Sequence, residues 1–225
     1  MPEPERNIAA ETSIAAEQLA HTSQRRTNLI FAALGMLTGL LSYLSKYATF
    51  GFLHFSFFPH AEYQGTASIL PGVIFGLLVA GCCHRFGTRH RVLLLLAVLI
   101  TTAAWILAFD LTSQAERTLG NELPRDLRGT LSFAIGGLVG GLGTCLAVAI
   151  ANPRFRRWEG WLLTVLIATL LGAVESVYDR MGEAGLLALF VVWQSAVIAS
   201  IARSLGRGGL GAGTSRTTPL TGSSV

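Results

Sequence analysis

The segment 51–65 reads GFLHFSFFPHAEYQG and holds residues whose types could bind a metal. His54, His60 and Glu62 form the pattern H-x5-H-x-E, and imidazole nitrogens with a carboxylate suit zinc or another transition metal. The spacing fits no standard zinc site. Aromatic residues surround the two histidines, and this composition is typical of a segment lying at a membrane–water interface. We therefore expect an interfacial segment here and no bound metal.

A second set of candidates consists of polar side chains inside or at the ends of apolar segments, where lipid makes them costly. Lys46 and Glu175 fall near the ends of two such segments, so they could pair with each other or extend to the lipid headgroups. Gln194 lies midway along an apolar segment, which favours an interhelical hydrogen bond over a substrate contact. Together with Asp110, these residues form a candidate solute pathway or docking surface.

Signatures of enzymes are missing from the chain. It contains no HExxH, no Gly-x-Ser-x-Gly and no phosphate-binding loop. The three cysteines (Cys82, Cys83 and Cys145) have no CxxC spacing, so neither a zinc site nor a disulfide framework is indicated. This pattern favours a function other than catalysis, and we expect no cofactor.

The elements that must position these residues follow from composition. The chain has 225 residues, of which 51% are hydrophobic and 13% charged, whereas a soluble domain has about 25% charged residues. The apolar residues gather in long runs without the alternation of barrel strands, which predicts an all-α bundle of six transmembrane helices. The predicted spans are 29–49, 67–83, 92–109, 131–151, 161–177 and 186–201.

The orientation of the bundle follows from its basic residues. Twelve of the sixteen arginines lie in the segments 1–27, 85–91, 154–157 and 203–216, which a six-span topology places on one side of the membrane. By the positive-inside rule this side is cytoplasmic. We therefore predict a multi-pass protein of a bacterial inner or plasma membrane with both termini in the cytoplasm. The predicted domains are a polar segment 1–27, a membrane domain 28–203 and a flexible tail 204–225.

Glycines within the spans indicate close helix packing. Gly35 and Gly39, and likewise Gly72 and Gly76, form GxxxG pairs, a spacing that lets helix backbones approach in lipid. The fourth span carries two overlapping pairs, formed by Gly136, Gly137, Gly140 and Gly141.

Residues 29–40 also match residues 131–142 at six of twelve positions. A true repeat would divide the six spans into two halves of three with opposite orientations, an architecture typical of transporters.

Three classes of function remain open. A small transporter, channel or substrate-binding membrane subunit for a small solute or ion comes first. A non-catalytic scaffold subunit of a larger membrane complex is the alternative, and an intramembrane enzyme is third. The expected partners are the lipid bilayer and either a second copy of the chain or a partner membrane subunit, but not nucleic acid. We expect the functional surface in the outer half, where the longest connections, 50–66 and 110–130, are predicted.

Overall fold

The structure is a computed structural model, and it describes residues 3–45, 54–55, 67–120, 122–174 and 181–210. The described residues form an all-α helical bundle, which confirms the predicted fold class. Its helices are α1 (Glu3–Ser45), α2 (Ile69–Arg85), α3 (Arg91–Thr118), α4 (Arg125–Ala151), α5 (Trp158–Ala173) and α7 (Glu183–Leu210), with a 3-10 turn, η2 (Pro153–Arg156), between α4 and α5. Two short strands, β1 (His54–Phe55) and β2 (Ala67–Ser68), pair antiparallel just before α2.

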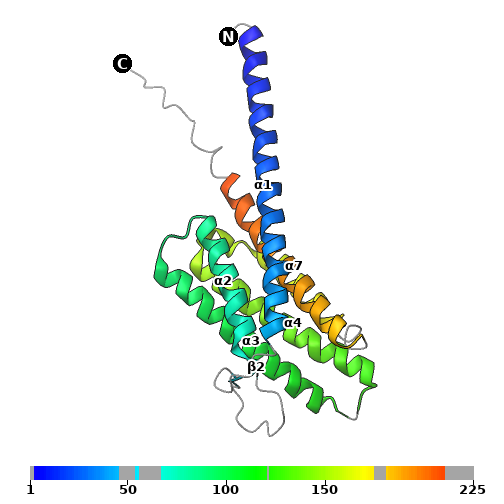
Figure 1. Ribbon diagram of the computed structural model, residues 1–225. Coiled ribbons are helices and arrows are strands. Elements are labelled where there is room, and N and C mark those ends of the chain that lie inside the picture. The colour runs from blue at the N-terminus through cyan, green and yellow to red at the C-terminus, as the bar shows by residue number, and fades with distance from the viewer. Residues whose placement is uncertain (1–2, 46–53, 56–66, 121, 175–180, 211–225) are drawn as a thin grey trace, which may run out of the picture.

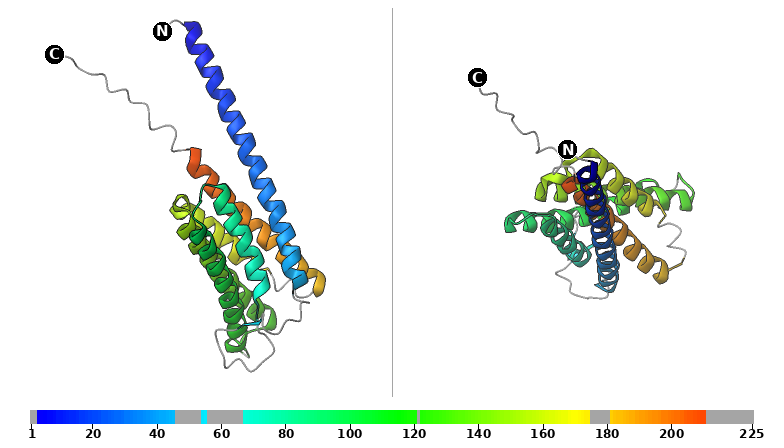
Figure 2. Two further views of the ribbon diagram at one scale, coloured as in Figure 1. Left: turned by 60° about the vertical axis from the view of Figure 1, so that its left-hand side comes forward. Right: turned by 90° about the horizontal axis from the view of Figure 1, so that it is seen from above.

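Successive helices run in alternating directions, so α1 begins and α7 finishes at the same end of the bundle (Figure 1). We call this the terminal end, and it also carries the turn between α2 and α3 and the turn η2. We call the opposite end, where α3 connects to α4 and α7 begins, the loop end. Helix α1 extends well beyond the other helices at the terminal end (Figure 2).

Four helical segments are long and apolar enough to cross a membrane, namely residues Gln18–Ser45, α3, α4 and Glu183–Arg207. The other two apolar helices, α2 and α5, have 17 and 16 residues. At 1.5 Å per residue they are about 25 Å long, somewhat less than the ~30 Å hydrocarbon layer. Exposed leucines, such as Leu95 and Leu99 on α3, cover the outside of the bundle. These features make the chain a membrane protein.

A core of buried side chains occupies the terminal half of the bundle. Val79, Phe155, Ile198, Ile201 and Leu205 are each at most 1% exposed, and they come from α2, η2 and α7. Two hydrogen bonds hold the turns at this end together. Thr88 Oγ1 donates to Ala151 O over 2.9 Å, and Asn152 Nδ2 donates to Phe86 O over 3.2 Å. The terminal end is therefore closed by a packed core.

The predicted glycine pairs lie where helices touch. A Cβ atom at Gly35 would lie 2.5 Å from Ser195 Cα, and one at Gly39 would lie 2.6 Å from Phe190 O, so both glycines face the backbone of α7. Gly72 and Gly76 face α3 in the same way, with backbone atoms of Thr102 and Val98 3.0 Å from the added Cβ. On α4, Gly137 and Gly141 face Ala168 of α5, whereas Gly136 faces Thr112 of α3.

Several helices extend past the predicted spans. Helix α3 continues to Thr118 and α4 begins at Arg125, so the long connection expected at 110–130 is confined to residues 119–124. Hydropathy marks where lipid ends, but a helix continues into water when its next residues are good helix formers. Helix α1 has no break at residue 27, and α7 continues past 204 to Leu210, with Leu205 buried in the core.

The matched segments 29–40 and 131–142 do not make equivalent contacts. An inverted repeat would exchange α1 with α4, α2 with α5 and α3 with α7. Helix pairs obey this exchange, since α1 packs on α7 and α2 while α4 packs on α3 and α5. The matched glycines do not, because Gly35 and Gly39 face α7, whereas Gly137 and Gly141 face α5 instead of α3. The identical glycines of the two matched segments therefore lie at helix interfaces that do not correspond to each other.

Candidate binding cavity

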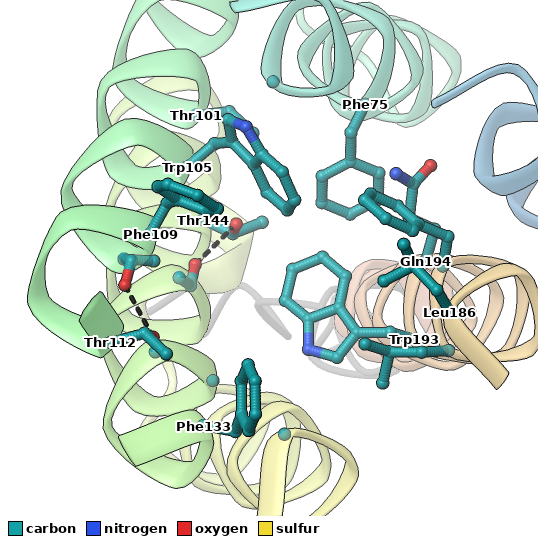
Figure 3. Close-up of a pocket in the computed structure, with 18 of the residues that line it drawn as sticks. Phe75, Thr101, Trp105, Phe109, Thr112, Phe133, Thr144, Leu186, Trp193 and Gln194 are labelled. Atoms are coloured by element: carbon teal, nitrogen blue, oxygen red, sulfur yellow. Dashed lines mark hydrogen bonds between the residues drawn. The ribbon is translucent and has the colours of Figure 1, made fainter. Parts of the chain in front are cut away.

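A cavity of about 420 Å³ lies between α2, α3, α4, α5 and α7 in the half of the bundle nearer the loop end (Figure 3). Thr101 and Gln194, which lie near the middle of α3 and α7, are among the residues that line it. The cavity therefore extends from the loop end to about half the depth of the bundle, where the packed terminal half begins.

Several glycines line this space. Gly136, Gly137 and Gly140 line the cavity together with Gly72 of α2 and Gly172 of α5. A Cβ atom at Gly140 would meet nothing closer than Trp193 Cζ2 at 3.6 Å. At Gly140 the wall of the cavity is consequently bare helix backbone with room beside it.

Aromatic rings form the other walls. Phe75 and Trp193 pack with their ring centroids 5.4 Å apart, and Trp105 and Phe190 with theirs 5.5 Å apart, both in tilted arrangements. The indole of Trp193 donates to Ala168 O over 3.3 Å, and that of Trp105 donates to the β2 carbonyl of Ser68 over 3.0 Å. Packing and hydrogen bonding together hold these rings in place, and Figure 3 shows Phe75, Trp105 and Trp193 directed toward the same space.

Buried polar atoms without a partner lie in the same walls. Thr101 is 2% exposed and Gln194 is 1% exposed. Gln194 Nε2 donates to Ser42 Oγ of α1 over 2.8 Å. Within the described part of the chain, Gln194 Oε1 and Thr101 Oγ1 make no hydrogen bond. Protein atoms enclose both oxygens. A buried polar atom without a partner costs roughly 1–3 kcal/mol, so a donor that reaches either oxygen gains a stabilising hydrogen bond.

A charged side chain lies at the loop end of the cavity. Glu116 is the one charged residue among the described residues that line the cavity, and Ser113 also lines it. Both residues also line a shallow neighbouring depression, which contains Arg117 and Arg128. Arg128 Nη1 donates to the carbonyl of Gly120 and so holds the connection between α3 and α4.

The structure brings together only some of the residues that the sequence indicated. Gln194 lines the cavity, as do Gly72, Gly136, Gly137 and Gly140. Asp110 is buried on α3 but does not line the cavity.

The remaining predictions fall largely outside the described residues, which include neither Lys46, His60, Glu62 nor Glu175. His54 belongs to β1, where only the backbone is described. Among the described residues, no group of three or more His, Cys, Asp or Glu side chains is placed to hold a metal ion.

Sequence reasoning missed the aromatic walls of the cavity. Trp105 and Trp193 lie well inside apolar helices, although tryptophan in membrane proteins is enriched at the interfaces. Two tryptophans away from the interface were therefore an available signal. Phe75 and Thr101 gave no such signal, because Phe and Thr are ordinary residues inside membrane helices.

No known protein family, curated protein or solved structure matches this chain. No relative therefore supplies a ligand for the cavity, and its chemistry rests on the residues that line it.

Proposed function

We propose that this membrane protein binds a small, largely apolar molecule in the cavity, as a carrier or as the substrate-binding subunit of a transport complex. The observation that supports this is the combination of bare backbone, fixed aromatic rings and two unpaired oxygens around one space of about 420 Å³. Ligand sites typically measure about 300–1,000 Å³ and are mostly apolar, with a few polar groups that orient the ligand. The cavity matches this description.

The position of the cavity favours a carrier or a binding subunit over a channel. A channel needs a continuous path, whereas here the packed core of the terminal half lies beneath the cavity. A site that is open toward one end and closed toward the other corresponds to one state of alternating access. The arginine distribution would place the terminal end in the cytoplasm of a bacterium, so that the cavity would open toward the outside.

Binding can be measured through the tryptophans of the cavity. With Trp158 and Trp161 replaced by Phe, only Trp105 and Trp193 remain to fluoresce. The purified protein in lipid nanodiscs is titrated with three brominated probes of similar size, since bromine quenches tryptophan on contact. The probes are 4-bromobenzyltrimethylammonium, the neutral 4-bromoneopentylbenzene and the anion 4-bromobenzenesulfonate. We expect saturable quenching by at least one of them.

A matched pair of variants tests whether the probe occupies the cavity. Gly140→Leu adds a side chain that fills the space beside Trp193, and we expect it to abolish saturable quenching. Gly81→Leu makes the same change on α2, where an added Cβ meets nothing within 4 Å, and should leave quenching unchanged. If no probe quenches saturably, or if both variants respond alike, the proposed function is wrong.

A second candidate function is that of an assembly subunit, and the length of α1 favours it. This helix extends past the bundle at the terminal end (Figure 2), and Leu19 on it is 72% exposed. A partner subunit that packs along α1 would bury this face. Co-purification in mild detergent, compared between the wild type and Leu19→Glu, tests this alternative: a partner lost in the variant supports it, whereas purification of the wild type alone opposes it.

A further inference from the structure

The hydrogen-bond donors in the cavity walls are largely committed to protein atoms. Both indole N–H groups donate to backbone carbonyls, as described above. The hydroxyls of Thr112 and Thr144 each donate over 2.8 Å to a carbonyl of their own helix, that of Ala108 and that of Gly140 (Figure 3). A threonine bound in this way offers only its lone pairs to a ligand.

Among the described residues that line the cavity, the buried polar side-chain atoms without a partner are two oxygens. Thr101 Oγ1 and Gln194 Oε1 are buried and unpaired, while the amide nitrogen of Gln194 donates to Ser42. An amide oxygen is an acceptor, and a threonine hydroxyl can also accept. A ligand that satisfies both atoms in the same way must therefore present hydrogen-bond donors.

The rings and the net charge of the walls add to this preference. The faces of aromatic rings carry partial negative charge and attract cations, tryptophan most strongly. Trp105 and Trp193 both line the cavity, and among the described residues the one charged side chain that lines it is the carboxylate of Glu116. The two arginines nearby, Arg117 and Arg128, line the adjoining depression and not the cavity. The described walls thus carry partial negative charge on ring faces and oxygens, and full negative charge on Glu116.

We propose that the ligand of this cavity is an organic cation, an ammonium group attached to an apolar substituent. This inference rests on the proposed function, because it names the class of molecule that the same cavity takes. The apolar substituent contacts α4 at Gly140, while the ammonium group lies against the indole faces. Protein atoms enclose the oxygens of Thr101 and Gln194 in the empty cavity, so these oxygens accept hydrogen bonds from the ligand after neighbouring side chains shift. Glu116 raises the local concentration of the cation at the loop end.

The three brominated probes test this directly. We expect the trimethylammonium probe, which engages the rings, to bind about tenfold more tightly than its neutral isostere, a ratio that corresponds to a desolvated cation–π contact. A primary ammonium analogue, 4-bromophenethylammonium, also donates to the two oxygens. Its affinity should fall several-fold in Thr101→Val, a variant of equal shape, while that of the neutral probe should not change.

Charge variants provide a second readout. Glu116→Gln should weaken binding of either cationic probe about two- to threefold at low ionic strength and leave the neutral probe unaffected. Glu122→Gln is the control, since Glu122 is exposed in the nearby connection but does not line the cavity.

The outcomes separate this inference from the proposed function. If the neutral or the anionic probe binds as tightly as the cations, and Gly140→Leu still abolishes that binding, the cavity is a binding site but not one for cations. If no probe gives saturable quenching that depends on residue 140, both the inference and the proposed function fail.

Discussion

Helices α4 and α5 approach so closely at Gly137 that adding one methyl group there should lower the free energy of unfolding. A Cβ atom at Gly137 would overlap the carbonyl oxygen of Ala168 and would also lie 3.1 Å from Thr169 Cα. On the partner helix, a Cβ at Gly172 would lie 3.2 Å from Gly137 Cα. The two backbones are therefore in direct contact, and a methyl group at Gly137 must push the helices apart.

The cost can be estimated by comparison with Gly140 on the same helix. Forcing extra methyl groups into a packed site typically costs about 1–3 kcal/mol. At Gly140 the nearest atoms to an added Cβ are 3.6 and 3.7 Å away, which is ordinary van der Waals contact. Alanine favours a helix over glycine by about 1 kcal/mol at either position, so this term cancels between the variants. Gly137→Ala should therefore be about 1–3 kcal/mol less stable than Gly140→Ala.

Reversible unfolding in mixed micelles, with increasing mole fractions of denaturing detergent, measures this difference. We expect Gly140→Ala to unfold at or above the wild-type midpoint and Gly137→Ala clearly below it. Equal unfolding free energies for the two variants would refute the assigned rotation of α4. So would a lower stability for Gly140→Ala.

The remaining predictions concern packing and topology. Gly39→Ala should destabilise the protein by about 1–3 kcal/mol, because its methyl group meets the backbone of α7, whereas Gly81→Ala should be neutral or slightly stabilising; the same unfolding assay compares them. In intact cells, a cysteine replacing the exposed Glu122 should react with a membrane-impermeant maleimide, and a cysteine replacing the exposed Arg89 should not. The native cysteines are fully buried and should not react. Labelling of the Arg89 variant alone would show that the orientation is the opposite of the predicted one.

Much of the fold was predictable because lipid imposes simple rules. A span must be helical, apolar and about 20 residues long, so composition alone yields the all-α bundle. Helix ends were less predictable. Asp110 was expected at the end of a span but lies well inside α3, because a helix continues past the apolar window wherever its backbone can keep its hydrogen bonds.

The candidate site was predictable only in part. Glycine density in the span 131–151 predicted a helix with close neighbours, and added Cβ atoms on that helix would meet α3 and α5. Gln194 was identified as a polar residue inside a span, and it is buried on α7. The metal-ligand pattern at 54–62 and the pair of Lys46 with Glu175 remain predictions, since their side chains lie outside the described residues.

The sequence by itself determined the class of the protein, because hydropathy is a local property that each segment carries independently. Tertiary structure decided the cavity. Phe75, Trp105 and Trp193 come from three helices far apart in sequence, and only the packing of α2, α3 and α7 brings their rings to one space. Tertiary structure also decided which glycines contact a neighbouring helix and which have space beside them for a larger side chain. Gly137 and Gly140 both line the cavity, yet an added Cβ would overlap α5 at Gly137 and find room at Gly140, because contacts with all its neighbours fix the rotation of α4.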